Sequence, residues 1–190
     1  MTPELQLIAN PGATYARLAR SPMRIGAVRA LRRPLLVALV LGSCVALLAT
    51  REAPAVLLVS TTLSWSIVAA GQVLIALALI RGPARATVGV ARALDLFFAG
   101  HVPWSLWMLA LVAWAPWPGL RPLAPPLIAA LIPLALTFRI IAAHFQHVLA
   151  LDRRTAFRRT ILHQALTWGL LLGIYGVAVA LYPRVVQWIG

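Results

Sequence analysis

The stretch PAVLLVSTTLSWSIVAAGQVLIALALI, residues Pro54–Ile80, decides the fold, because it runs for 27 residues without a charge. About 20 apolar residues in a helix suffice to cross a hydrocarbon core of roughly 30 Å. Lipid offers no hydrogen-bond partner to the backbone, so a crossing segment of this kind must be helical. The stretch therefore predicts a transmembrane helix that is long enough to tilt.

The composition of the whole chain supports this interpretation. Of its 190 residues, 62% are apolar and 11% are charged, and the mean hydropathy is +0.89. Soluble domains carry about 45–50% apolar and about 25% charged residues. These values exclude a soluble enzyme domain, a disordered chain and a disulfide scaffold. The single cysteine, Cys44, permits neither an intramolecular disulfide nor a cysteine-based metal site.

Four further apolar runs are long enough to cross a bilayer. They are Pro34–Thr50, Leu94–Ala115, about Ala124–Ala143 and Ile161–Tyr182. We therefore predict an all-α, polytopic membrane protein with five transmembrane helices, which form one domain over residues 34–190.

The arginines predict the orientation in the membrane. All 17 basic residues are arginine, and they give a net charge of +13. Three lie on one side of the five expected spans, namely Arg51, Arg121 and Arg184, and the other 14 lie on the opposite side. Because arginine gathers on the cytoplasmic side of membrane proteins, we expect a cytoplasmic N-terminus and an external C-terminus. We also expect the membrane to be a bacterial inner membrane. We expect no nucleic-acid partner, because the arginines alternate with apolar runs.

Residues 1–33 form an arginine-rich, amphipathic segment that precedes the first expected span. The turn Asn10-Pro11-Gly12 and then Pro22 divide it into short helical pieces. Such a segment can lie on the inner leaflet or dock against the inner face of the protein itself.

Polar residues gather towards the inner ends of the expected spans. They are Asp95, His101, Arg139, His144, His147 and His163. Histidines with an aspartate could form a metal, haem or proton-relay site. However, the spacing matches no metal motif and no span contains a glutamate, so we expect no metal, no cofactor and no catalytic residue.

Structural roles explain the same residues more simply. Asp95 can pair with Arg92 or, across helices, with Arg139, which could otherwise extend to the lipid headgroups. We expect His144, His147 and His163 to be interfacial, and His101, which is the deepest of the four, to bond to a neighbouring helix. Its different depth argues against a haem held by two histidines. Asp152 is expected to cap the helix that follows it.

Small residues suggest where helices pack. Gly169, Gly173 and Gly176 form a stripe on the last expected span, which could contact another span or a second copy of the chain.

Three segments resemble the Yip-type domain family of small five-span membrane proteins, in its bacterial branch. They are NPGATYARL at Asn10–Leu18, ALDLFFAGHVPW at Ala93–Trp104 and ILHQAL at Ile161–Leu166. The acidic Asp-Leu-Tyr-Gly-Pro motif of the relatives associated with Rab-type GTPases is absent. The resemblance implies a five-span layout and a non-enzymatic membrane role, with no catalytic residues to carry over.

These observations favour a scaffold or accessory subunit that acts through packing with membrane proteins or with itself, and that catalyses no reaction. One alternative is a haem- or metal-bearing anchor of an electron-transfer complex. Another is a small transporter that uses the polar residues of Pro54–Ile80 together with Asp95 and His101.

Overall fold

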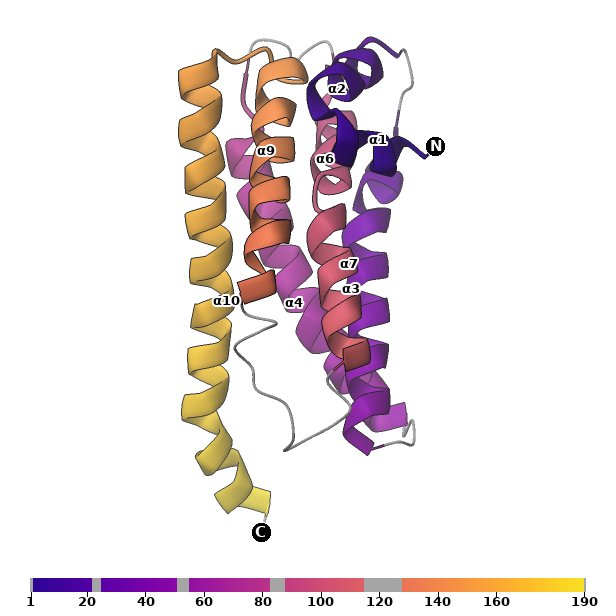
Figure 1. Cartoon of the computed structure of the whole chain (residues 1–190). Helices are drawn as coiled ribbons and strands as arrows, with labels where there is room; N and C mark the ends of the chain where they lie inside the picture. Colours follow the sequence, from indigo (N-terminus) through magenta and orange to yellow (C-terminus); the bar gives the residue numbers. More distant parts are fainter. Residues whose placement is uncertain (1, 22–24, 51–54, 83–87, 115–127, 190) are drawn as a thin grey trace.

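The computed structural model describes residues 2–21, 25–50, 55–82, 88–114 and 128–189, and within these it is helical and contains no strand. The helices are α1 (Pro3–Ala9), α2 (Pro11–Arg20), α3 (Ala27–Thr50), α4 (Ala55–Leu79), α6 (Val90–Ala99), α7 (Val102–Trp114), α9 (Leu131–His147) and α10 (Arg153–Ile189) (Figure 1). The expectation of an all-α protein is confirmed.

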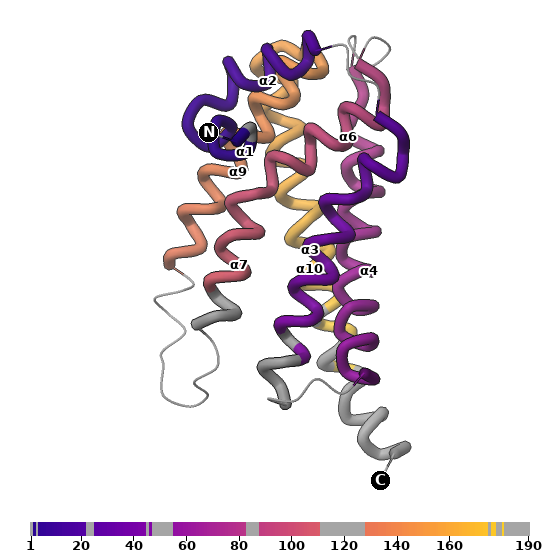
Figure 2. Tube along the Cα trace, turned by 90° about the vertical axis from the view of Figure 1, so that its right-hand side faces the viewer, coloured from indigo at the N-terminus to yellow at the C-terminus, as the bar shows by residue number. Residues whose placement is uncertain are grey.

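The long helices lie side by side and run alternately up and down in the order α3, α4, α6 with α7, α9 and α10 (Figure 1). Helix α3 packs mainly against α4, while α10 packs against α9 and α4. The short helices α1 and α2 cover one end of this bundle, beside the end of α9 (Figure 2). We call this the arginine end, and it also carries the first residues of α10.

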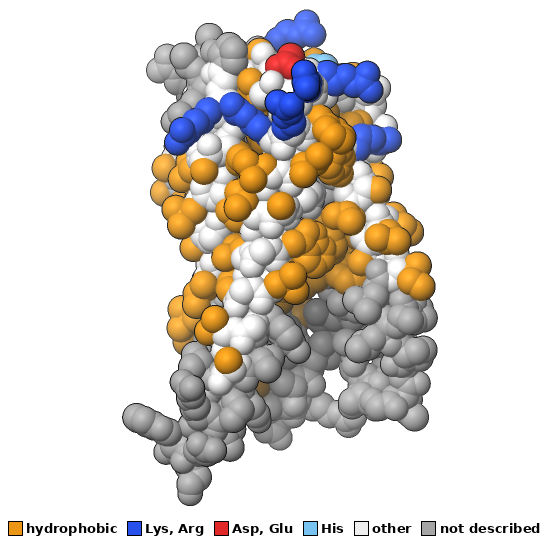
Figure 3. All heavy atoms as spheres, turned by 90° about the vertical axis from the view of Figure 1, so that its left-hand side faces the viewer, with side chains coloured by type: hydrophobic (Ala, Val, Ile, Leu, Met, Phe, Trp, Pro, Cys, Tyr) orange, Lys and Arg blue, Asp and Glu red, His pale blue; other side chains and the backbone are white. Residues whose placement is uncertain are grey.

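The surface is divided into two zones. On the face shown in Figure 3, basic side chains gather at the arginine end, and apolar side chains are spread over the described part of the helices next to it. Within the described residues, one helix, α4, is long and apolar enough to cross a membrane by length and composition. Only 17% of its most apolar window is buried inside the structure, whereas the core helix of a soluble protein would be mostly buried.

The third expected span, Leu94–Ala115, is not one continuous helix. It breaks between α6 and α7, where Gly100 N–H donates to Phe97 O (3.0 Å) and His101 N–H donates to Phe98 O (3.1 Å). Pro103 has no N–H and fits the first turn of a new helix, so α7 begins there. The break sets the direction in which the His101 side chain points away from the backbone.

Two other boundaries differ from the expected ones. Helix α3 begins at Ala27 and continues through Pro34, so it includes the last residues of the expected N-terminal segment. Helix α10 begins after Asp152, whose Oδ1 accepts hydrogen bonds from the N–H groups of Arg154 and Thr155, each at 3.0 Å. The expected cap is confirmed.

Candidate functional site

An ion-pair cluster joins three helices at the arginine end. The Arg33 guanidinium on α3 contacts Glu4 of α1 at 2.9 Å and Asp95 of α6 at 3.3 Å. Arg92 also contacts Asp95, at 3.6 Å. The expected pairing of Asp95 with Arg92 is confirmed, and the alternative with Arg139 is wrong. The role of Arg33 could not be deduced from the sequence, because 62 residues separate it from Asp95.

Arg139 instead binds the end of α1. Its guanidinium donates hydrogen bonds to the carbonyl oxygens of Ile8 and Ala9 (3.3 Å to Ala9). The last carbonyls of a helix have no partner within the helix, and a cation satisfies both their hydrogen bonding and the helix dipole. The interpretation of Arg139 as a headgroup-seeking side chain is therefore wrong.

Two more arginines do the same for other helices. Arg159 donates to Leu79 O at 2.8 Å and to Arg81 O, at the end of α4. Arg92 donates to Leu18 O near the end of α2, at 3.3 Å. Part of the arginine excess on this side thus holds helix ends together.

The N-terminal segment docks on the bundle. Leu7 and Tyr15 are fully buried, and the Tyr15 hydroxyl donates to Leu96 O at 3.0 Å. Burial raises the pKa of Tyr15 well above its ordinary value, so the hydroxyl stays protonated. Of the two placements considered for residues 1–33, the structure shows docking for α1 and α2.

Three histidines surround the ring of Phe97. The ring centroids of His101, His144 and His163 lie 5.0, 5.5 and 5.1 Å from that of Phe97. His144 and His163 are buried, so the expectation that they are interfacial is wrong. The fourth histidine, His147, is exposed beside α2 and does not join this group.

His101, in the break between α6 and α7, forms a direct pair with His163 of α10. Their Nε2 atoms lie 3.3 Å apart, so the prediction that His101 bonds to a neighbouring helix is confirmed. The expectation that His101 lies at a different depth from the other histidines is wrong for His163. Depth was estimated by counting residues along each helix, which does not include the shift of one helix along another.

The hydrogen bonds assign the protons of this pair. Phe97 O, 3.2 Å from His101 Nδ1, can only accept, so His101 Nδ1 carries the proton. With both rings neutral, His101 Nε2 accepts and His163 Nε2 donates, and Thr167 Oγ1, 3.3 Å from the same His163 nitrogen, is a second acceptor for that N–H. This leaves His163 Nδ1 as an acceptor, and it is buried with no hydrogen-bond partner in the part of the chain described.

A cavity of about 310 Å³ lies next to this pair, among α3, α4, α6, α7, α9 and α10. Four tryptophans form much of its wall: Trp65, Trp104, Trp107 and Trp168. Its polar lining includes Gln72, His101, Thr137, His163, Gln164 and Thr167. The sequence indicated His101 and His163 as candidates but not the tryptophans, Thr137 or Gln164, because only the assembled bundle brings six helices together around one space.

Three of the residues that line the cavity have a buried polar atom without a partner. Thr137 Oγ1, His163 Nδ1 and Gln164 Nε2 make no hydrogen bond to any described residue. Leaving such a group unpaired costs about 1–3 kcal/mol, and native proteins rarely accept this. A bound molecule with its own polar groups would relieve this cost.

The remaining sequence-predicted features are not brought into this site. Asp95 and Arg139 serve the arginine end, and a Cβ built on Gly169, Gly173 or Gly176 would have no described atom within 4 Å apart from the adjoining backbone of α10 itself. The glycine stripe therefore does not contact another described span. The described residues contain no group of three or more His, Cys, Asp or Glu side chains that could hold a metal ion.

No protein-family model, curated protein or solved structure matches this chain. The resemblance to the Yip-type family is neither supported nor opposed by this result and stays a prediction.

Proposed function

We propose that this chain is a five-span protein of the bacterial inner membrane, with the arginine end in the cytoplasm and the C-terminus outside. The apolar length of α4, the alternating direction of the long helices and the basic zone at one end support this placement. Exposed leucines on the outer faces support it as well, since Leu63 is 61% and Leu172 is 65% exposed. A water-soluble protein rarely shows so much continuous apolar surface.

Within the membrane, the protein binds a small, mainly apolar molecule in the cavity and does not transform it. The observation that carries this proposal is the coincidence of tryptophan walls with three buried, unpaired polar groups. Ligand pockets are typically apolar with a few convergent polar groups, and their volumes begin at about 300 Å³.

The unpaired atoms define the polar part of the ligand. Gln164 Nε2 donates and His163 Nδ1 accepts, so the ligand carries an acceptor and a donor of its own, such as a carbonyl and a hydroxyl. The indole rings favour a flat or unsaturated apolar part, which stacks well on them.

Filling the cavity tests the proposal. Ala69 on α4 lines the cavity, whereas its neighbour Ala70 is exposed on the same helix. Ala69→Phe and Ala70→Phe are purified in mild detergent with the wild type, and small molecules in their organic extracts are identified by mass spectrometry. We expect one stoichiometric compound in the wild type and in Ala70→Phe, and its loss from Ala69→Phe. No such compound in the wild type, or its full retention by Ala69→Phe, would contradict the proposal.

A scaffold or accessory role is the second candidate, and the open stripe of Gly169, Gly173 and Gly176 on α10 favours it. The resemblance to Yip-type proteins implies a non-enzymatic role of the same kind. The hypothesis of a small transporter gains support from Gln72 and His101, two of the polar residues considered for a transport path, because both line the cavity.

A haem- or metal-bearing anchor has the weakest support. The imidazoles of His101 and His163 lie within hydrogen-bond distance of each other, and both pack on Phe97, which leaves no space for a porphyrin between them. An absorbance spectrum of the purified protein tests the haem hypothesis, because a Soret band would restore it.

A further inference from the structure

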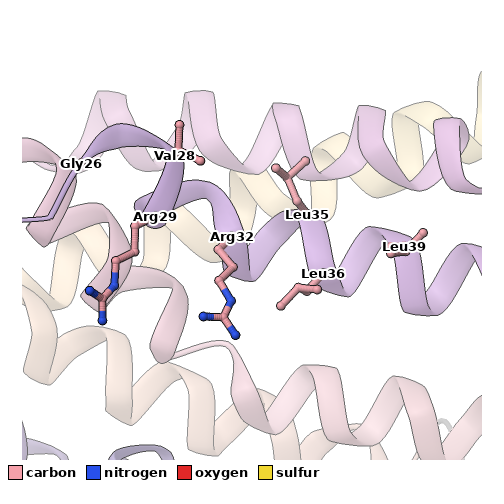
Figure 4. Close-up of a pocket in the computed structure, with 7 residues that line it drawn as sticks. All are labelled: Gly26, Val28, Arg29, Arg32, Leu35, Leu36 and Leu39. Carbon is pink, nitrogen blue, oxygen red and sulfur yellow. The ribbon is translucent and has the colours of Figure 1, made fainter.

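A second hollow lies on the outside of the bundle, along the first part of α3. It is an open groove of about 580 Å³ between Gly26 and Leu39, lined by Arg29, Arg32 and three leucines (Figure 4). It is separate from the cavity among the helices, and neither α1 nor α2 lines it.

The two arginines of this groove are unpaired. Arg29 and Arg32 are both exposed and have no ion pair or hydrogen bond to any described residue. The neighbouring carboxylates, Glu4 and Asp95, are both engaged by Arg33. Two fixed positive charges are therefore left without a counter-charge from the described protein.

The geometry places both charges on one side of α3. Arg29 and Arg32 are three residues apart, about 4.5 Å along the helix axis, and their side chains extend in the same direction (Figure 4). Guanidinium groups bind phosphate oxygens through paired hydrogen bonds, so two of them at this spacing can share one phosphate.

An apolar surface continues from the charges towards the middle of the bundle. Leu35, Leu36 and Leu39 are 55%, 46% and 51% exposed, and they follow Arg32 by about 4.5 to 10.5 Å along the axis. This order, a phosphate site followed by an apolar strip parallel to the helix, matches a phospholipid with its headgroup at the membrane surface and its acyl chain in the hydrocarbon.

We propose that Arg29, Arg32 and the leucines of α3 form a binding site for an anionic phospholipid of the inner leaflet. The proposal rests on the membrane placement under Proposed function but not on the cavity ligand. Charge complementarity selects the lipid over a protein partner, since two unpaired arginines and a strip of leucines are complementary to the headgroup and the chain of one molecule.

Native mass spectrometry of the full-length protein in detergent tests the site, with dioleoyl phosphatidylglycerol and dioleoyl phosphatidylcholine as probes. We expect the wild type to bind the first phosphatidylglycerol more tightly than phosphatidylcholine. Arg29→Gln/Arg32→Gln should weaken that first binding step about tenfold, as expected for the loss of charged hydrogen bonds. Arg153→Gln/Arg154→Gln is the matched control: it removes the same charge from exposed side chains that point about 100° apart around α10, and it should behave as the wild type.

Three outcomes would overturn the proposal. They are equal affinity of the wild type for the two lipids, no loss of affinity in Arg29→Gln/Arg32→Gln, and effective competition by glycerol 3-phosphate, which has the phosphate but no acyl chain. Release of the protein from membranes by alkaline carbonate would instead contradict the membrane placement, so the two failures are distinguishable.

Discussion

The hydroxyl of Tyr15 donates a hydrogen bond to the carbonyl oxygen of Leu96, 81 residues away, at 3.0 Å. The Leu96 carbonyl does not receive the usual helical hydrogen bond from Gly100, because the helix breaks just after it and the Gly100 N–H donates to Phe97 O instead. The side chain of His101 in turn bonds to Phe97 O at 3.2 Å. The docked N-terminal segment thus stabilises the break that directs His101 towards His163.

Removing this hydroxyl should destabilise the fold. Tyr15→Phe leaves Leu96 O buried without a partner, which costs about 1–3 kcal/mol. Reversible unfolding in detergent by denaturant should show this loss of unfolding free energy. Leu5→Ala, on the half-exposed face of α1, is the control and should change it little. A stability of Tyr15→Phe equal to that of the wild type would mean that water or another group reaches the carbonyl.

Asp95→Asn should loosen the arginine end while keeping the shape of the side chain. Arg33 and Arg92 both lose a charged partner, and the Arg92 side chain is only 9% exposed. Buried pairs cost about 3–5 kcal/mol to break, but Arg33 is 34% exposed and solvent weakens its pairing, so we expect about 1–3 kcal/mol.

Glu4→Gln supplies the comparison for Asp95→Asn. It breaks a single ion pair, which is more exposed than those of Asp95, so it should lower the unfolding free energy by less than about 1 kcal/mol. Limited proteolysis checks both variants, with α1 and α2 cleaved faster in Asp95→Asn. If Glu4→Gln proved the more damaging variant, Asp95 would not be the centre of the cluster.

The sequence predicts features of this protein that depend on neighbours along the chain. The helical class follows from uncharged runs such as Pro54–Ile80, and the Asp152 cap follows from the chemistry of one helix start. The i to i+3 pairing of Arg92 with Asp95 is of the same kind. In the last two cases the interacting groups lie within one helix turn, and in the first the signal is continuous along the chain.

The candidate site could not be predicted in this way. His101 and His163 meet only because the break between α6 and α7 lies at the same height as the first half of α10, which no single-helix pattern contains. Arg139 has its partners in α1, whose last carbonyls come within hydrogen-bond distance of the guanidinium only once α1 is docked on the bundle. Residue counting therefore assigned His163 and Arg139 to the lipid interface, although the folded protein supplies both with partners.

The cap of α10 predicts a dependence of stability on pH. A hydrogen bond from the Thr155 side chain, together with backbone N–H groups, holds the pKa of Asp152 below its ordinary value of 3.8. The stabilising effect of the ionised cap is therefore full above that value and is lost as the pH falls through the lower pKa of the folded protein. Unfolding midpoints of the wild type and Asp152→Asn, measured from neutral to acidic pH, should converge in that range. The asparagine keeps the acceptor oxygen but does not titrate, so a constant difference between the two midpoints would exclude this linkage.

Two glycines on different helices should respond oppositely to the same substitution. A Cβ on Gly42 of α3 would lie 2.6 Å from Thr62 Cα of α4, and backbone atoms cannot move aside as a flexible side chain can. Gly42→Ala should therefore separate α3 from α4, weaken the bond from Thr61 Oγ1 to Gly42 O (2.8 Å) and cost about 1–3 kcal/mol. Gly173→Ala meets open space and should keep or raise stability by up to about 1 kcal/mol, because alanine is the better helix former. Unfolding in detergent by denaturant measures both variants, and equal losses would contradict this assignment of the two helix faces.

A larger side chain at Gly173 distinguishes two possibilities for this face of α10: that it binds another helix, or that it faces only lipid. Gly173→Ile leaves the described fold unobstructed, so its unfolding free energy should stay close to that of the wild type. If α10 associates closely with another helix, the branched side chain prevents the approach that glycines permit, and the fraction of dimer or of co-purified membrane protein should fall. Crosslinking in membranes and mass spectrometry of the extracted complex measure this fraction, with Ala70→Phe on the exposed face of α4 as the control. An assembly unchanged by Gly173→Ile would remove the support that the glycine stripe gives to a scaffold role and leave the cavity as the better-supported function.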